Sequence, residues 1–138
     1  MAHLPFHYRR RVHFAETDLA GVVHFSTYFR YMEEAEHALW RRAGLTIARA
    51  GSATIWPRVT ASFDYKAPLR YDDEFAVHVA IERVGRRSIR YELTIVRGDT
   101  LIGTGTMTSV SVTQTSGGTM SAVDVPPDTV VRLRAAIG

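Results

Sequence analysis

Apolar residues recur along the chain at two different spacings, and each spacing predicts a type of element. From Phe25 to Ala43 the large apolar side chains recur at close to the helical period, and Gly44 follows them as a natural stop. This pattern predicts one long helix over 26–43, with Ser26 or Thr27 at its N-terminal cap. We expect a second, short helix near the C-terminus, at 128–136.

Period-two alternation of apolar and polar residues predicts the strands. The alternating segments are 8–14, 55–68, 74–85, 87–98 and 100–113. Two of these segments assign one face to the core, through Phe75, Val77, Val79 and Ile81 and then through Ile89, Tyr91, Leu93 and Ile95. The last segment carries Gly103 and Gly105, where a backbone can bend or pack closely.

One strand, one long helix and four further strands joined by short turns are typical of an α+β protein, with a curved antiparallel sheet wrapped around the helix. The sequence shows no repeat and no second domain, so we expect a single domain over 1–138 with a loose tail from about residue 114. Open sheet edges favour edge-to-edge dimerisation. The charged residues of the helix fall mostly off its apolar face; they are Glu33, Glu34, Glu36, Arg41 and Arg42.

Composition narrows the possible partners. The 17 Lys and Arg residues against 14 Asp and Glu residues give a formal net charge of +3, which suits an anionic small molecule as well as nucleic acid. The arginines are dispersed and no recognised nucleic-acid module occurs, so nucleic-acid binding ranks last. The absence of cysteine excludes disulfides and thiolate metal sites.

The sequence also carries no targeting signal that we recognise. No apolar run approaches the ~20 residues of a membrane-spanning helix. The N-terminal residues lack the continuous apolar segment of a signal peptide. We therefore expect a cytoplasmic protein that does not associate with membranes.

Glu33, Glu34 and His37 lie close together in the sequence of the predicted helix and suggest a metal site. Glu33 and His37 stand four residues apart on the predicted helix, a spacing that can hold a metal. The sequence offers no third convergent ligand and no H-E-x-x-H pattern, so we expect a solvated helix face and no metal. Glu16, at the end of the first predicted strand, is interpreted as a surface acid.

Asp18 is the most informative single residue. It lies in a tight turn a few residues before the long helix, whose N-terminus already attracts negative charge. Asp often caps such turns, and that role alone would explain it. Alternatively, its carboxylate is held beside a site where a second negative charge develops during a reaction. The turn by itself leaves both interpretations open.

The stretch "VHFAETDLAGVVHFSTYFRYMEEAEHALW" resembles the signature of the 4-hydroxybenzoyl-CoA thioesterase family of hotdog-fold proteins. In that family a strand precedes Asp-x-x-Gly-x-Val and then a central helix with an early Tyr and a later acid. The matching positions here are Asp18, Gly21, Val23, Tyr28 and Glu34.

A later stretch of the chain resembles the sheet of the same family. Its aromatic-Lys/Arg-x-Pro segment corresponds to Tyr65, Lys66 and Pro68, and an Asp-Asp/Glu turn and two long strands follow it. Together the two matches cover most of residues 8–113. The resemblance implies a hotdog fold, with a sheet wrapped around one central helix.

The resemblance also implies an activity and an assembly. The activity is hydrolysis of an acyl-CoA or acyl-carrier-protein thioester to a free acid and a thiol, without a metal or redox cofactor. Protomers of the family pair edge to edge and place their active sites at the interface, which implies a homodimer or homotetramer.

Four residues are candidates for the chemistry. The resemblance implies that Asp18 is the nucleophile or the general base. Free backbone N–H groups at the start of a helix, reinforced by its dipole, can stabilise a developing oxyanion, and those of Val23, His24 and Phe25 are the candidates. The His24 side chain either donates to the thioester oxygen or shuttles a proton, or it packs at the helix start while only its backbone N–H acts.

Further residues are substrate-binding candidates. Two arginines in "GRRS" supply planar donors for the phosphates of coenzyme A, although arginines at a hairpin end are also commonly solvated. Aromatic residues shape an acyl pocket or simply pack, and the helix acid acts in catalysis, in orienting a partner or in dimerisation. The candidates are Gly21, Tyr28, Glu34, Trp56, Tyr65, Arg86, Arg87 and Ser88.

Two other functions compete with thioester hydrolysis. One is a hotdog protein that binds or assembles without turnover. The other is a hotdog dehydratase, which needs a catalytic His and a helix acid and which His24 and Glu34 keep open. The Asp18–Gly21 pattern resembles thioesterases better, so an acyl-CoA thioesterase is the favoured hypothesis.

Overall fold

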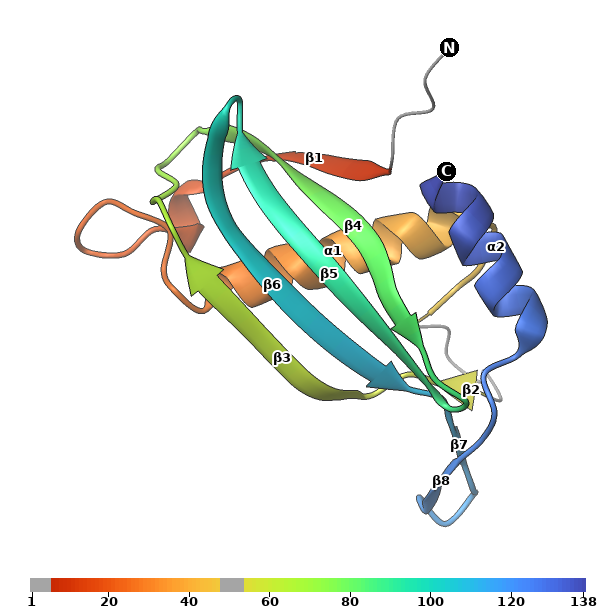
Figure 1. Ribbon diagram of the computed structural model, residues 1–138. Coiled ribbons are helices and arrows are strands. Elements are labelled where there is room, and N and C mark those ends of the chain that lie inside the picture. The colour runs from red at the N-terminus through yellow and green to blue at the C-terminus, as the bar shows by residue number, and fades with distance from the viewer. Residues whose placement is uncertain (1–5, 48–53) are drawn as a thin grey trace.

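A single long helix, α1 (Thr27–Arg42), lies across one face of a five-stranded sheet (Figure 1). The computed structural model describes residues 6–47 and 54–138. The sheet has the order β1-β4-β5-β6-β3, and all neighbouring strands are antiparallel. Its strands are β1 (His7–Arg11), β3 (Arg58–Tyr65), β4 (Glu74–Val84), β5 (Ser88–Arg97) and β6 (Thr100–Val110). The expected α+β arrangement is confirmed.

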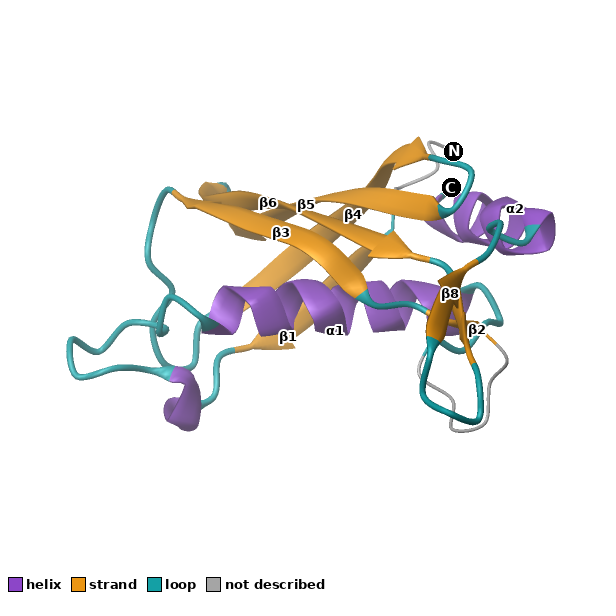
Figure 2. Cartoon of the chain, turned by 90° about the horizontal axis from the view of Figure 1, so that it is seen from below, coloured by secondary structure: helices purple, strands orange, loops and turns teal. Residues whose placement is uncertain are grey.

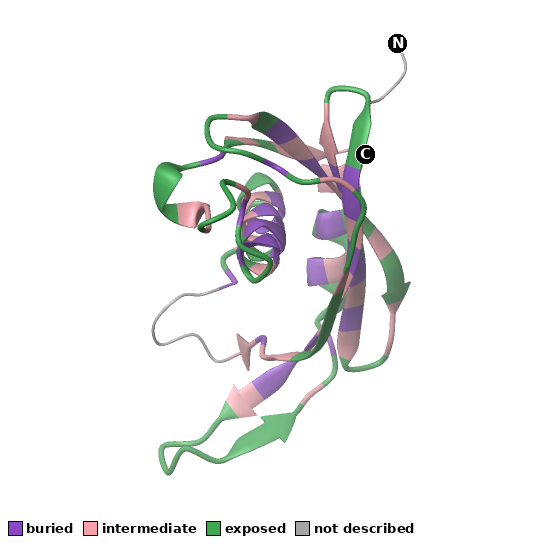
Figure 3. Cartoon of the chain, turned by 90° about the vertical axis from the view of Figure 1, so that its left-hand side faces the viewer, coloured by how far each residue is buried: buried purple, intermediate pink, exposed green. Residues whose placement is uncertain are grey.

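The core lies between α1 and the sheet face that curves around it (Figures 2 and 3). The helix buries Tyr31, Met32, Ala35 and Leu39 completely, as its apolar period predicts. The inward faces assigned to the strands at 74–85 and 87–98 are also confirmed, with only Ile81 partly exposed. Burial of this apolar face, rather than helix propensity alone, is what stabilises α1 in its position.

Gly105 allows the helix and the edge strand to approach β6 closely. A Cβ atom placed there would stand 2.3 Å from Met32 Sδ on α1 and 2.8 Å from the Ser62 carbonyl oxygen on β3. The second of these contacts is with backbone and has no easy relief. The close packing expected for this glycine is confirmed.

Two predicted strands are each divided in two. Pro57 has no N–H to donate, so 55–68 separates into β2 (Thr54–Ile55) and β3. At Ser111 the chain passes from the five-stranded sheet into a second sheet, so 100–113 separates into β6 and β7 (Val112–Gln114). The strand expected at 8–14 ends at Arg11 because a 3₁₀ turn, η1 (Phe14–Glu16), follows it.

The C-terminal segment is more ordered than the expected loose tail. β8 (Met120–Ala122) pairs with β7, and β7 pairs with β2, which makes a second sheet of three strands. The expected final helix is confirmed as α2 (Pro127–Ile137), and its Leu133 is fully buried in the core cluster. In the part of the chain that the structure describes, no helix has the length and apolar character to cross a membrane.

Glu36 departs from the expected solvent-facing position of the helix charges. It is fully buried, because it lies one turn from Met32 and one turn from Trp40 on the same helical stripe. Its carboxylate contacts the Arg58 guanidinium on β3 and accepts a hydrogen bond from Ser109 Oγ at 3.4 Å. Burial raises the pKa of Glu36 to about 6, although Arg58 and Ser109 act in the opposite direction.

The free energy of unfolding should depend on pH through the titration of Glu36. The pKa of Glu36 is raised from 4.5 to about 6 on folding, so the folded state binds its proton more tightly than the unfolded state. The contribution of this proton to stability is therefore fully present below pH 4.5 and is lost as the pH rises through 6. We expect the free energy of unfolding of the wild type, relative to Glu36→Gln, to fall by about 2 kcal/mol between pH 4.5 and 7. Urea unfolding at a series of pH values measures it. A difference that is flat or rises with pH would contradict the assignment.

Candidate active site

Asp18 lies at the base of a narrow loop that leads into α1. Thr17 forms an antiparallel bridge with Val23, and the Asp18 amide donates to the Val22 carbonyl at 2.8 Å. Gly21 closes the turn by donating its amide to the Asp18 carbonyl at 3.0 Å, and its φ of +81° is a conformation that glycine adopts without strain. The loop is therefore fixed by its own backbone.

The Asp18 carboxylate divides its two oxygens between two environments. Oδ1 accepts the backbone amides of Ala20 at 2.8 Å and Val22 at 3.4 Å, so it caps the turn. Oδ2 has no hydrogen-bond partner among the described residues. The side chain is partly exposed. Turn capping thus leaves one carboxylate oxygen available to a reacting group.

Of the three amides expected to bind an oxyanion, two already donate hydrogen bonds within the chain. The Val23 N–H donates to the Leu69 carbonyl at 2.8 Å, and the His24 N–H donates to the Glu16 carbonyl at 2.9 Å. Within residues 6–47 and 54–138, the Phe25 N–H meets no acceptor. It precedes the first residue of α1 by two positions, where the helix dipole favours negative charge. Phe25 therefore supplies the one amide of the three that can donate to a ligand.

The His24 side chain turns toward Ser26. Its Nδ1 lies 2.8 Å from Ser26 Oγ and accepts the Ser26 amide at 3.3 Å, and its ring lies 4.6 Å from that of Phe25. Ser26 occupies the N-terminal cap position, as expected, but its hydroxyl makes no hydrogen bond to the helix. The imidazole is exposed, and Nε2 is the ring nitrogen left to face solvent.

Aromatic residues surround this end of α1. Tyr65 donates its hydroxyl to the Phe25 carbonyl at 2.7 Å and packs edge-on against Tyr28. Tyr28 is buried, and its hydroxyl accepts the Leu69 amide at 3.3 Å. Burial raises the pKa of Tyr28, and Asp18 is among the charges that act on it. The exposed apolar side chains around the turn are Phe14, Leu19, Phe25, Tyr65 and Tyr71.

Four of the expected substrate-binding residues lie at the opposite end of the sheet. Trp56 is buried, and its ring packs at 5.0 Å against Trp40. Arg86 and Arg87 follow β4 at the far end from the Asp18 turn, and both are exposed and paired with Asp124, at 3.0 Å and 3.3 Å (Figure 1). Ser88 begins β5 beside them. The structure therefore does not bring these residues to Asp18 within one chain.

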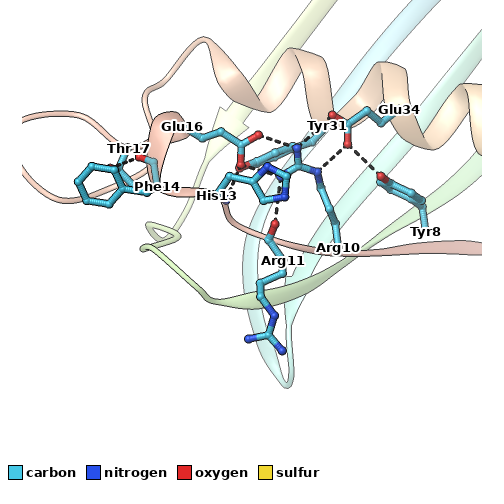
Figure 4. Close-up of polar contacts among 9 residues, drawn as sticks. All are labelled: Tyr8, Arg10, Arg11, His13, Phe14, Glu16, Thr17, Tyr31 and Glu34. Carbon is cyan, nitrogen blue, oxygen red and sulfur yellow. Dashed lines mark hydrogen bonds and ion pairs between the residues drawn. The ribbon is translucent and has the colours of Figure 1, made fainter.

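Glu34 lies neither at the Asp18 turn nor with the residues at the opposite end of the sheet. It accepts the Tyr8 hydroxyl at 3.0 Å and pairs with Arg10 Nε at 2.7 Å (Figure 4). Arg10 alternates with Tyr8 and Val12 along the chain and its side chain is largely buried, whereas Arg9 and Arg11 are exposed. The strand alternation in the sequence already contained this signal.

Glu16 is not the surface acid that the sequence suggested. Its side chain is only 17% exposed, and it takes part in a polar cluster with Arg10 and Tyr31 that lies beside the Asp18 loop (Figure 4). The sequence alone does not reveal the cluster, because its three members come from β1, the loop and α1.

Two further features lie outside the Asp18 turn or bear on a metal site. No group of three or more His, Cys, Asp or Glu side chains among the described residues is placed to hold a metal ion. A hollow of about 730 Å³ lies over β1 and β4, with His7, Arg9 and His78 among its lining residues, and none of its lining belongs to the Asp18 turn.

Comparisons with known proteins bear on the family and the fold. The sequence model of the thioesterase superfamily matches residues 20–104. A relative from Aquifex aeolicus, whose name as an esterase is provisional, is 38% identical over 97 residues, which are 70% of this chain and 76% of the relative. A 1,4-dihydroxy-2-naphthoyl-CoA hydrolase from a Synechococcus strain is 26% identical over 110 residues, 75% of this chain and 74% of that enzyme.

Solved structures share the fold over nearly the whole chain. A hypothetical protein from Aquifex aeolicus superposes with a TM-score of 0.86 and 32% identity, covering 94% of this chain and 99% of that one. The gentisyl-coenzyme A thioesterase BH1999 superposes with a TM-score of 0.83 at 24% identity, covering 93% and 99%. At 24% identity, the similarity to BH1999 supports the fold alone.

Proposed function

The chain belongs to the thioesterase superfamily, a family of thioester hydrolases with the hotdog fold, and on this premise we propose that it hydrolyses acyl-coenzyme A thioesters at the Asp18 turn. One observation carries the proposal. A free carboxylate oxygen, Asp18 Oδ2, and a free amide, that of Phe25, stand on the two legs of one loop at the N-terminus of α1.

The Phe25 amide is the proposed oxyanion donor. Attack on a thioester carbonyl moves negative charge to the carbonyl oxygen, and a preorganised N–H at a helix N-terminus stabilises that charge. The hydrogen bond from Tyr65 to the Phe25 carbonyl holds this residue in place. Val23 and His24 support the site by fixing the loop through their own amides rather than by donating to substrate.

Asp18 is the proposed reacting acid. As a general base it takes a proton from water while the water oxygen bonds to the carbonyl carbon. The C–S bond then breaks, and the departing sulfur takes the proton from Asp18 and leaves as the thiol of coenzyme A. As a nucleophile its carboxylate bonds to the carbonyl carbon, and the C–S bond breaks so that the coenzyme A thiolate leaves and takes a proton from water. Water then hydrolyses the mixed anhydride, which releases the acid and restores the Asp18 carboxylate. Both routes need Oδ2 beside the carbonyl carbon while Oδ1 keeps the turn closed.

The proposed acyl group is aromatic. One sequence relative is named for an aromatic acyl group, that of 1,4-dihydroxy-2-naphthoyl-CoA. The turn itself is surrounded by exposed rings, those of Phe14, Phe25, Tyr65 and Tyr71. Such rings favour the stacked or edge-on contacts that an aryl group can make.

The proposed assembly is a homodimer or a larger homo-oligomer. Arg86 and Arg87 lie at the far end of the sheet from Asp18, so we propose that they bind the phosphates of coenzyme A at the active site of a second copy. Their pairing with the exposed Asp124 is weak enough for a phosphate to compete with it.

Asp18→Asn should lower kcat by about 100-fold or more, because the amide can neither attack the carbonyl nor accept the proton. The fold should persist, since the Asn oxygen still accepts the turn amides. Thiol release from a panel of aromatic and aliphatic acyl-CoA esters measures kcat, and thermal unfolding measures the fold. Asp99→Asn, in the β5–β6 turn, is the matched control and should keep wild-type turnover. Undiminished turnover by Asp18→Asn across the panel would remove Asp18 from the chemistry.

Replacing Arg86 and Arg87 together by Ala should raise KM for acyl-CoA esters by about tenfold, because the loss of one or two charge-assisted hydrogen bonds weakens binding by about that factor. KM for short thiol esters that lack phosphates should stay near the wild-type value. Arg90→Ala changes an exposed arginine on β5 that pairs with Glu82, and it serves as the control. Equal changes in KM for both ester types would refute the phosphate-binding role.

A further inference from the structure

We propose that Glu16 is a positioning residue for catalysis, which holds the Asp18 turn and the Phe25 amide in register with α1. The proposal deepens the function proposed above and rests on it, because Asp18 and Phe25 are taken as the reacting acid and the oxyanion donor. Glu16 itself touches no reacting atom.

The Glu16 carboxylate is held from three directions. Arg10 donates Nη1 to Oε1 and Nη2 to Oε2, both at 2.6 Å, in a bidentate pair (Figure 4). Oε1 also accepts the Tyr31 hydroxyl at 2.9 Å and the His13 amide at 2.8 Å. The side chains of Arg10 and Glu16 are only 13% and 17% exposed, so water screens the pair weakly.

Arg10 is itself fixed to α1. Its guanidinium lies 4.8 Å from the centre of the fully buried Tyr31 ring, and its Nε pairs with Glu34 at 2.7 Å. Burial alone would raise the pKa of Glu16, but the hydrogen bonds from Arg10, the His13 amide and Tyr31 lower it below its ordinary value. The carboxylate therefore stays ionised at neutral pH and remains a fixed point between β1 and α1.

The backbone of Glu16 connects the anchored carboxylate to the Asp18 loop. The Glu16 carbonyl accepts the His24 amide at 2.9 Å, the next residue Thr17 bridges to Val23, and Asp18 then donates its amide to Val22. Glu16 thus forms the first rung of the short ladder that joins the two legs of the loop. Asp18 lies two residues beyond it on one leg, and Phe25 follows its partner His24 on the other.

The Asp18 turn needs an anchor of this kind. The Asp18 side chain makes its hydrogen bonds to amides of its own turn, and Leu19 at the tip is fully exposed. The turn is therefore rigid within itself but gains its orientation from the base of the loop. A displacement of about 1 Å at a reacting group can lower a rate by about 100-fold.

Four variants test the proposal against the wild type: Glu16→Gln, Asp18→Asn, the two together, and Glu74→Gln. Glu74 pairs with Arg11, the neighbour of Arg10, on the outer side of the sheet, so its variant removes a nearby ion pair without touching the loop. We expect Glu16→Gln to lower kcat about 10- to 100-fold and to change KM less than about twofold. In the Asp18→Asn background it should change the residual kcat less than about twofold, because residues that act as a unit are not additive. Glu74→Gln should leave kcat unchanged.

Tyr31→Phe is the second, milder variant. It keeps the buried ring and removes only the hydroxyl that donates to Glu16, so it decides the matter if Glu16→Gln does not fold. We expect it to lower kcat about 3- to 10-fold, again with little change in KM and only in the presence of Asp18.

The outcomes separate this proposal from the proposed function. Folded variants with kcat within twofold of wild type, a loss confined to KM, or an equal loss of kcat in the Asp18→Asn background would each overturn the positioning role alone. A wild type that hydrolyses no thioester, or an Asp18→Asn variant with full activity, would overturn the proposed function and this inference with it.

Discussion

The pairing of residues 16–18 with 22–24 is the constraint on which the candidate site depends. These backbone hydrogen bonds close a loop with its two ends side by side, one carrying Asp18 and the other leading to Phe25 at the start of α1. The same pairing uses up the amide of His24, while Leu69 uses that of Val23. What remains is one carboxylate oxygen and one amide on adjacent legs, and that combination suits attack on a carbonyl group.

The rest of the fold explains why this loop can be small and still be rigid. α1 is buried along its length against a curved sheet, and Gly105 lets helix, β6 and β3 approach closely near the end where the loop begins. Arg10 on β1 then ties the loop to the flank of the helix through Glu16. A loop anchored in this way to packed elements gives a reacting group a defined position.

The sequence predicted the elements well, because helix and strands each bury one face and therefore show a regular period. Their ends were less predictable, since they depend on local features such as the missing N–H of Pro57 and the passage of the chain at Ser111 into the second sheet. Glu36 was missed for a different reason. Its spacing placed it on the buried stripe, but a buried carboxylate is tolerated only because Arg58 comes from a distant strand to meet it.

In the candidate site, too, the sequence predicted some features and missed others. The family signature located Asp18 and the helix start, but it did not reveal which amide stays free, because their acceptors are carbonyls distant in sequence. Glu16 illustrates this limit most clearly. It looks like a surface acid until β1, the loop and α1 are brought together around it.

A crystal structure with a non-hydrolysable aryl-CoA thioester analogue would test the central claim most directly. The account predicts a carbonyl oxygen within about 3 Å of the Phe25 nitrogen and the free oxygen of Asp18 facing the carbonyl carbon. A carbonyl bound by other donors, with Asp18 directed away from the carbon, would contradict it.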